Sequence, residues 1–201
     1  QYNSAGEIFY ACFGAVLLRR NVLKKVGYFD EAYFLYHEDV DVSWRMRLAG
    51  YRIIYAPESV VYHAHRATSS LFKWSSVVFH CEKNRLMSLL KNYSVFMLLA
   101  ALPFHALLSV LRAANALLKG RPRECLAMAR AFAWNAVNLA GTLRQRKKAQ
   151  ALRKVSDLAL LGLMDKFSIE LKIKLGMLKS EVKSKVAQDS AAEKNKKDFE
   201  D

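Results

Sequence analysis

The sequence predicts an α/β segment over residues 1–75, followed by a mostly α-helical extension. Two short apolar runs of strand length, Phe13–Leu18 and Tyr51–Tyr55, lie on either side of a stretch with helical spacing, and this alternation is typical of α/β structure. After the first segment the apolar residues recur at helical spacing only. We expect the extension to have two parts, residues 76–120 and residues 121–201.

The first predicted elements are a strand, a short helix and a loop. Phe13–Leu18 is apolar throughout, which is typical of a strand buried on both faces. Asn21 can cap a helix that runs through Val26, and Gly27 suits the left-handed position that ends such a helix. Residues 28–37 follow neither a strand period nor a helix period, so we expect a loop there.

The clearest helical pattern in the first segment begins at Asp39. Val40, Trp44 and Leu48 recur at every fourth position, so they share one face of a helix. Gly50 follows directly and is the expected end of that helix.

Strands, a long helix and an apolar stretch follow. Residues 51–55 and 60–63 are strand-like, with a turn at Pro57 between them, and residues 75–91 have the pattern of a helix. Residues 92–111 then run for 20 positions without a formal charge. That length would just cross a hydrocarbon core of about 30 Å.

The apolar stretch allows three interpretations, which are a membrane-spanning helix, a helix in the membrane plane and a buried hairpin. Pro103 should kink any helix here, and His105 and two serines weaken the case for a span. Gly120 and Pro122 separate this stretch from an alanine-rich helix. The first part of the extension is therefore predicted to be a helix plus an apolar, membrane-associated or buried segment.

Residues 121–201 are predicted to form a basic, amphipathic helical tail. From Asp157 onward, apolar residues recur at steps of three and four: Met164, Phe167, Leu171, Leu175, Leu178, Val182 and Val186. This stripe would pack on its own domain, on a second copy in a homo-oligomer, or on a membrane surface. From about Ser184 the chain is polar and we expect it to be frayed.

The positive charge is concentrated in the extension. Residues 1–70 carry a net charge of +1, and residues 71–201 supply the other +13 of the formal +14. Basic helices rich in leucine and valine favour an anionic membrane surface as partner. No zinc-finger spacing or RNA-binding motif is found, so nucleic acid is not expected. Three scattered cysteines (Cys12, Cys81 and Cys125) argue against a disulfide framework.

Three carboxylates, Glu38, Asp39 and Asp41, gather at the start of the second predicted helix, behind a loop rich in aromatics. Partly buried carboxylates need partners, so a cation, a metal or a proton-bearing substrate is expected there. The simpler interpretation is that Asp39 caps the helix and Asp41 is ordinary first-turn charge. At that position the helix dipole should favour the ionised form of Asp39, as a general base requires.

His63 and His65 form a second group, on one face of a predicted strand end. Neutral imidazoles there could bind a metal, although a hydrogen-bonded histidine at a sheet edge is commoner. No third histidine is clustered with them, so any metal must be shared with carboxylates or phosphates.

Three successive stretches resemble family 2 glycosyltransferases of the rhamnosyltransferase-like branch. They are GAVLLRR (14–20), VGYFDEAYFLYHEDVDVSWRMRLAGY (26–51) and APESVVYHAHRATSS (56–70). A weaker likeness continues through EKNRLMSLLKNYS (82–94) and RKKAQALRKVSDL (146–158). The resemblance implies the C-terminal, acceptor-side half of a Rossmann-like GT-A domain, acting in cell-surface polysaccharide synthesis.

The resemblance also implies roles for individual residues. Asp39 would be the general base that takes the proton of the acceptor hydroxyl during inverting transfer, with Glu38 in support. Asp30, Glu31 and Trp44 would contact the acceptor, which is a saccharide or a lipid-linked saccharide. The donor would be a nucleotide sugar.

His63, which follows Asp39 by 24 residues, would complete a Mg²⁺ or Mn²⁺ site that holds the donor pyrophosphate. The Asp-x-Asp metal motif that such enzymes carry in an N-terminal sheet is absent from this sequence. We therefore expect this chain alone not to transfer sugar. Its expected location is the cytoplasmic face of the inner membrane, peripheral or integral.

Two other functions remain open from the residues. The chain could be a non-catalytic, membrane-associated binding or scaffold module in which the carboxylates are structural. Less favoured is a metal-dependent hydrolase that uses His37, His63 and His65 with Glu38 and Asp39.

Overall fold

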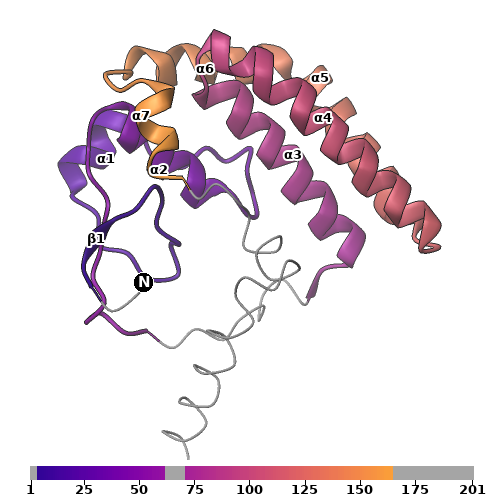
Figure 1. Cartoon of the computed structure of the whole chain (residues 1–201), viewed down its shortest axis with the longest axis horizontal. Coiled ribbons are helices and arrows are strands. Elements are labelled where there is room, and N and C mark those ends of the chain that lie inside the picture. Colours follow the sequence, from indigo (N-terminus) through magenta and orange to yellow (C-terminus); the bar gives the residue numbers. More distant parts are fainter. Residues whose placement is uncertain (1–3, 62–70, 165–201) are drawn as a thin grey trace, which may run out of the picture. The chain divides into compact units, whose positions relative to one another are not determined.

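The computed structural model describes residues 4–61 and 71–164. These residues lie in the first of two compact units, Gln1–Leu163, except for Met164, which begins the second. Helices dominate, and α3 to α6 follow one another without a strand (Figure 1). The elements are β1 (Gly6–Glu7), α1 (Arg20–Val26), α2 (Glu38–Leu48), β2 (Ile54–Tyr55), α3 (Trp74–Asn92), α4 (Val95–Leu118), α5 (Pro122–Val137), α6 (Leu139–Ala151) and α7 (Asp157–Leu161).

The sheet within the described ranges is a two-stranded antiparallel ribbon, in which Gly6 pairs with Tyr55 and Glu7 with Ile54. Arg47 of α2 fixes this ribbon from the side. Its guanidinium donates to the carbonyl oxygen of Ile53 at 3.2 Å and pairs with Glu7. The prediction of a strand over residues 51–55 is therefore confirmed only for its last two residues.

The predicted strand at Phe13–Leu18 is wrong. Residues 13–18 are turn and irregular structure, and the side chain of Leu17 is fully exposed. Phe13 and Leu18 instead pack against the cluster formed by α1 and α2. An apolar run becomes a strand only when neighbouring strands take its backbone hydrogen bonds, and no described strand runs beside this one.

Helices α1 and α2 form the local core of the first segment. Val22 and Val26 of α1 pack against Val42 and Met46 of α2. The predicted cap at Asn21 is wrong, because α1 already begins at Arg20 and its N-cap residue, Arg19, makes no side-chain cap. The helix nevertheless ends as expected.

Two glycines end helices as the sequence predicts. Gly27 has φ of +87° and donates its N–H to the carbonyl oxygen of Leu23, closing α1. Gly50, with φ of +84°, follows the last turn of α2. Both conformations lie in the left-handed region that glycine reaches without steric cost.

Helix α3 is the centre of the helical part. It packs against α5 and α6, and α4 packs against α5 and α3 (Figure 1). The predicted helix over residues 75–91 is confirmed by α3. α4 continues through Pro103, and Gly120 and Pro122 separate it from α5 as expected.

The C-terminal end of α3 is closed by side chains of α6. Arg146 Nη1 donates to the carbonyl oxygens of Leu90 and Tyr93, both at 2.6 Å. Gln150 Nε2 donates to the carbonyl oxygen of Lys91 at 2.9 Å. These carbonyls lack partners within their own helix, and positive side chains also suit the negative end of the helix dipole. The basic stretch 146–158 thus acts as a structural clamp on α3.

Several predictions fall outside the described ranges. They include the end of the strand expected over residues 60–63, the apolar stripe after Met164 and the frayed end from about Ser184. Residues 60 and 61 are described and are not in a strand.

Candidate active site

The loop between α1 and α2 has an unusual backbone. Phe34, Tyr36 and His37 all have positive φ angles, of 59°, 64° and 67°. Residues other than glycine rarely occupy this left-handed region, which costs roughly 1–2 kcal/mol per residue. Three such residues within four positions need support from elsewhere in the fold.

Helix α3 supplies that support. Asn84 Nδ2 lies 2.9 Å from the carbonyl oxygen of Tyr33 and 2.7 Å from those of Leu35 and Tyr36. The Asn84 side chain is fully buried. Ser88, one turn further along α3, lies with its Oγ 2.9 Å from Tyr33 Oη. The loop that leads into α2 is thus held in place by one face of α3.

A buried group of charges joins α2 to the same face of α3. Asp41 is fully buried, and its carboxylate is 3.0 Å from Arg45, 3.1 Å from Lys91 Nζ and 3.1 Å from Asn92 Nδ2. Lys91 Nζ also lies 2.7 Å from Asp30 Oδ2. Asp41 was predicted to be ordinary first-turn charge. It does lie in the first turn, but it is a structural ion-pair partner.

The electrostatics of Asp41 fit this structural role. Burial raises the pKa of its carboxyl, but the charges of Lys91 and Arg45 outweigh that effect, so the pKa lies below its ordinary value. A carboxylate held ionised by buried cations is a poor acceptor of a substrate proton. Asp41 is therefore not a general base.

Glu38 and Asp39 are the first two residues of α2, directly after the left-handed His37. Both side chains are half-buried. Asp39 Oδ1 accepts a hydrogen bond from the N–H of Val40 at 2.7 Å. Glu38 Oε2 is buried and has no hydrogen-bond partner among the described residues. The two carboxylates thus retain acceptor capacity that this part of the chain does not use.

Burial raises the pKa values of both carboxyls, with backbone hydrogen bonds acting in the opposite direction. At Asp39 burial outweighs these backbone hydrogen bonds, so the net shift is upward, and the prediction that the helix N-terminus favours the ionised form stays a prediction. A raised pKa makes the carboxylate a stronger base. Of the three carboxylates, Asp39 and Glu38 have the environment suited to proton transfer.

The residues predicted to contact the acceptor occupy different environments. Asp30 is paired with Lys91, and Glu31 is exposed. Trp44 is only 4% exposed and packs edge-to-face between Phe9 and Tyr93, at ring-centroid distances of 5.4 and 4.7 Å. Ring packing explains the burial of Trp44, although its indole N–H has no hydrogen-bond partner among the described residues, and Glu31 is exposed.

The segment that contains this site matches a known protein family. Residues 7–77 match the family described as glycosyltransferase like family 2. These residues are part of a glycosyltransferase family 2 domain. The matched range takes in the loop before α2, all of α2 and the first turn of α3, so Glu38, Asp39 and Asp41 belong to the family 2 segment. Asn84, Ser88 and Lys91, which hold that loop and helix, lie beyond the matched range. No solved structure matches the chain at a significant level.

Two curated relatives are rhamnosyltransferases. The N-acetylglucosaminyl-diphospho-decaprenol L-rhamnosyltransferase of Mycobacterium tuberculosis is 46% identical over 55 residues, which are 27% of this chain and 18% of that protein. Rhamnosyltransferase WbbL of Escherichia coli K12 is 38% identical over 63 residues, 30% of this chain and 24% of that protein. The match thus covers less than a quarter of the length of either relative.

The described residues of the family 2 segment do not by themselves form a metal site. They contain no group of three or more His, Cys, Asp or Glu side chains arranged to hold an ion. His63 and His65, the predicted ligands, lie outside the described ranges. Burial, aided by the charge of Arg85, lowers the pKa of His37 to about 4, so this imidazole is neutral near pH 7.

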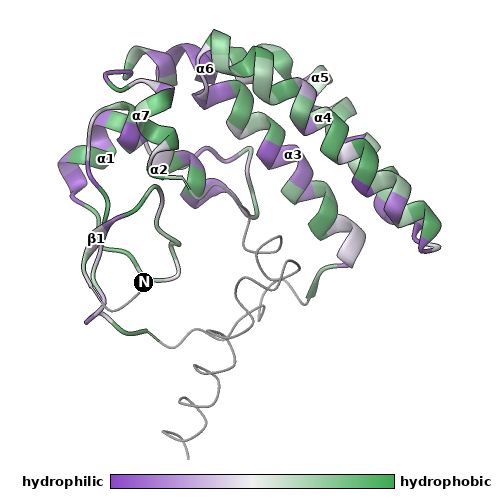
Figure 2. Ribbon diagram, in the orientation of Figure 1, coloured by the Kyte–Doolittle hydropathy of each residue, from purple (hydrophilic) through white to green (hydrophobic). Residues whose placement is uncertain are grey.

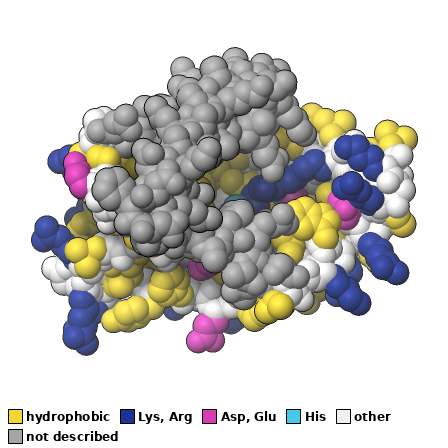
Figure 3. Space-filling view, turned by 90° about the horizontal axis from the view of Figure 1, so that it is seen from below, with side chains coloured by type: hydrophobic (Ala, Val, Ile, Leu, Met, Phe, Trp, Pro, Cys, Tyr) yellow, Lys and Arg dark blue, Asp and Glu magenta, His cyan; other side chains and the backbone are white. Residues whose placement is uncertain are grey.

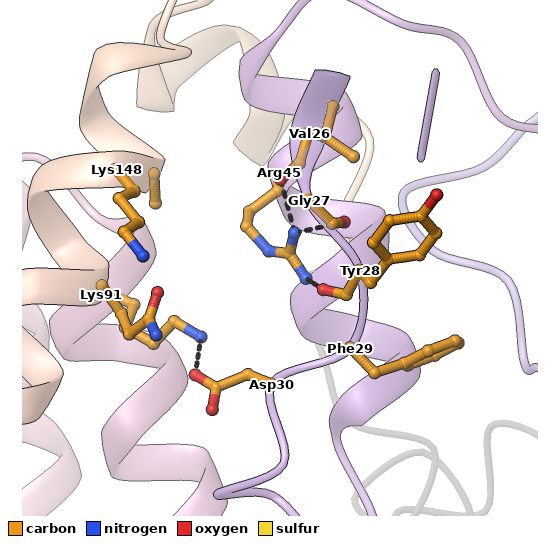
Figure 4. A pocket seen from close by; sticks show the side chains of 10 residues that line it. Val26, Gly27, Tyr28, Phe29, Asp30, Arg45, Lys91 and Lys148 are labelled. Atoms are coloured by element: carbon orange, nitrogen blue, oxygen red, sulfur yellow. Dashed lines mark hydrogen bonds and ion pairs between the residues drawn. The ribbon is translucent and has the colours of Figure 1, made fainter. Parts of the chain in front are cut away.

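A cavity of about 220 Å³ lies beside the family 2 segment, between residues 26–30 and α6 (Figure 4). On one wall the Arg45 guanidinium donates to the carbonyl oxygens of Gly27 and Tyr28, each at 2.8 Å. Lys148 of α6 lies on the opposite wall. Neither Glu38 nor Asp39 lines this cavity, so it is not where the candidate base would act.

The residues that hold the site together were not among those predicted from the sequence. Asn84, Ser88 and Lys91 are buried on α3 and face the loop and α2. A signal for them existed, because they recur at steps of four and three within a predicted helix and so form a polar stripe. Their partners in the loop and in α2 lie about 50 residues earlier in the chain, so no local sequence pattern identifies those partners.

Proposed function

We propose that this chain carries the acceptor-side part of an inverting glycosyltransferase of rhamnosyltransferase type. A sugar would pass from a nucleotide-sugar donor to a saccharide or lipid-linked acceptor in cell-surface polysaccharide synthesis. The observation that carries the proposal is the family 2 match over the segment in which Glu38 and Asp39 begin α2.

In this proposal Asp39 is the general base. It would accept the proton of the acceptor hydroxyl as that oxygen attacks the anomeric carbon, and the nucleotide would leave with the electrons of the broken bond. The raised pKa of Asp39 supports this role. So does its position at the start of α2, directly after the loop that α3 holds in place. Glu38, whose Oε2 lacks a partner among the described residues, would hydrogen-bond to the acceptor.

The partners are inferred from the relatives. The printed name of the mycobacterial relative specifies a diphospho-decaprenol acceptor, which is lipid-linked. We propose an acceptor of the same chemical class here, and a location at the cytoplasmic face of the inner membrane. A Mg²⁺ or Mn²⁺ ion, with His63 as one ligand, would neutralise negative charge on the leaving nucleotide.

The function is tested by a transfer assay on the intact protein that contains this sequence. Nucleotide-linked L-rhamnose, labelled in the sugar, is incubated with a polyprenyl-diphosphate saccharide, and the product is extracted into the lipid phase. We expect label in the lipid fraction, with the opposite anomeric configuration to the donor. Release of free sugar alone would indicate a hydrolase, and no turnover of any nucleotide sugar would indicate a binding module.

A further inference from the structure

Helix α4 has an inverted distribution of polarity. Its buried residues include His105 and Ser109, while ten of its large apolar side chains are 40–88% exposed. Figure 2 shows the hydrophobic colouring along this helix. The exposed apolar residues are Val95, Phe96, Leu99, Phe104, Leu107, Leu108, Val110, Leu111, Leu117 and Leu118. A helix that faced water would bury these residues and expose the polar ones.

The polar face of α4 is bound to α3 through one carboxylate. Glu82 of α3 is buried, and its Oε1 lies 3.2 Å from His105 Nε2. Ser109 donates a hydrogen bond to the same oxygen, and Arg112 Nη2 lies 2.9 Å from Oε2. His105, Ser109 and Arg112 follow at steps of four and three, so they form a single narrow face. Because this polar face contacts α3, the apolar side of α4 points away from α3.

A cluster of basic residues lies where α4 ends. Lys119, Arg121 and Arg123 are exposed around the turn into α5, and within the described part of the chain Arg121 alone of the three pairs with an acidic side chain, Glu124 at 3.6 Å. Figure 3, seen from below the view of Figure 1, shows lysine and arginine side chains beside hydrophobic ones around the grey residues, with a few acidic groups among them. Apolar and basic side chains together are complementary to a bilayer surface with anionic headgroups.

The neighbours of α4 indicate how it meets a bilayer. By length and composition, α4 could cross a membrane. However, it packs against α3, which buries Glu82, Lys83 and Lys91, and against α5, which carries Arg123 and Arg130. A crossing would draw these helices into the hydrocarbon, where charged groups are costly. One exposed face can be buried without that cost when the helix lies in the interface.

We propose that α4 lies in the plane of a membrane interface, with its apolar face among the acyl chains and the Lys119–Arg123 turn on anionic headgroups. This goes beyond the proposed sugar transfer and does not depend on it. Through Glu82 and Asn84, α3 joins this helix on one side and the loop before α2 on the other. Binding of α4 to the bilayer would thus fix the position of the family 2 segment relative to the membrane.

The first test is sedimentation of the full chain with vesicles of phosphatidylcholine and phosphatidylglycerol. Replacing Leu107→Gln together with Leu111→Gln removes apolar side chains from the exposed face without touching a described contact. We expect vesicle affinity to fall roughly tenfold or more. The matched control is Leu17→Gln with Leu71→Gln, since both leucines are at least 82% exposed but lie outside α4. It should bind like the unchanged chain.

The basic turn is tested by replacing Lys119, Arg121 and Arg123 with glutamine. Affinity for vesicles containing phosphatidylglycerol should fall by roughly fivefold per charge, and affinity for pure phosphatidylcholine should change little. Circular dichroism of every variant checks that the helices remain folded. Unchanged vesicle binding by the α4 leucine pair would overturn the proposal.

Two further outcomes also decide against it. If light scattering shows a dimer without vesicles and the Leu107→Gln/Leu111→Gln chain is monomeric, a second copy covers the face instead. If carbonate washing of membranes from cells that produce the full chain fails to release it, α4 spans the bilayer. Release by carbonate, with a monomer in solution, is the expected result.

Discussion

At the scale of single residues, three neighbouring carboxylates differ in environment. Asp41 is a structural ion-pair partner, whereas Asp39 and Glu38 are the candidates for proton transfer. Asp41 has three polar partners, Arg45, Lys91 and Asn92, and a lowered pKa, while Asp39 and Glu38 have few partners and raised pKa values. All three stand in the first turn of the same helix, so position alone does not distinguish them. What distinguishes them is whether a buried cation such as Lys91 lies within reach.

The role of Asn84 is tested by Asn84→Ala in the full chain. The substitution leaves the carbonyl oxygens of three loop residues without their donor and releases the left-handed backbone at Phe34, Tyr36 and His37. We expect the free energy of unfolding to fall by about 2–3 kcal/mol, measured by urea denaturation. Asn115→Ala, at an exposed position of α4, is the control and should change it by less than about 0.5 kcal/mol. An equal loss of unfolding free energy for Asn84→Ala and Asn115→Ala would show that Asn84 does not hold the loop before α2.

At the scale of elements, helix ends and the long helices could be predicted from the sequence. Gly27 and Gly50 mark the ends of α1 and α2 because their left-handed conformations are a local requirement. The strand at Phe13–Leu18 could not be judged locally, since an apolar run needs neighbouring strands. Likewise, the burial of Lys91 depends on Asp41, 50 residues away, so local periodicity does not reveal it.

The junction between α3 and α4 is tested by the pH dependence of stability. Burial raises the pKa of Glu82, but contacts with His105 and Ser109 and the charges of Arg112 and Arg85 lower it to about 2. The ionised carboxylate is therefore favoured in the folded state. Its contribution, on the order of 1–3 kcal/mol, is present above about pH 4.5 and is lost as the pH falls towards 2.

Glu82→Gln should remove this dependence. The free energy of unfolding of the unchanged chain should fall more steeply between about pH 4.5 and 2 than that of the variant, as followed by denaturant titration at each pH. Glu58→Gln, at an exposed position, should leave the steep fall in place. Parallel curves for the Glu82→Gln and unchanged chains would show that Glu82 does not hold α3 and α4 together.

At the scale of the whole molecule, α3 connects the segment proposed to take part in sugar transfer with the helix proposed to bind a membrane. One of its faces holds the loop before α2, and another holds α4 through Glu82. The sequence showed a neutral first segment and a basic, helical remainder. It left open whether residues 92–111 span, lie on or avoid a bilayer. The contacts of α4 with charged helices favour the in-plane arrangement, which the vesicle and carbonate experiments test.

The proposed sugar transfer depends on Asp39 as the general base. The most direct measurement is kcat of the intact protein carrying Asp39→Asn, with nucleotide-linked L-rhamnose and a polyprenyl-diphosphate saccharide. We predict a fall of about a hundredfold or more, with unchanged circular dichroism, because asparagine keeps the shape but cannot accept the proton. Glu58→Gln should retain full activity. A kcat for Asp39→Asn within a fewfold of the unchanged protein would contradict the account.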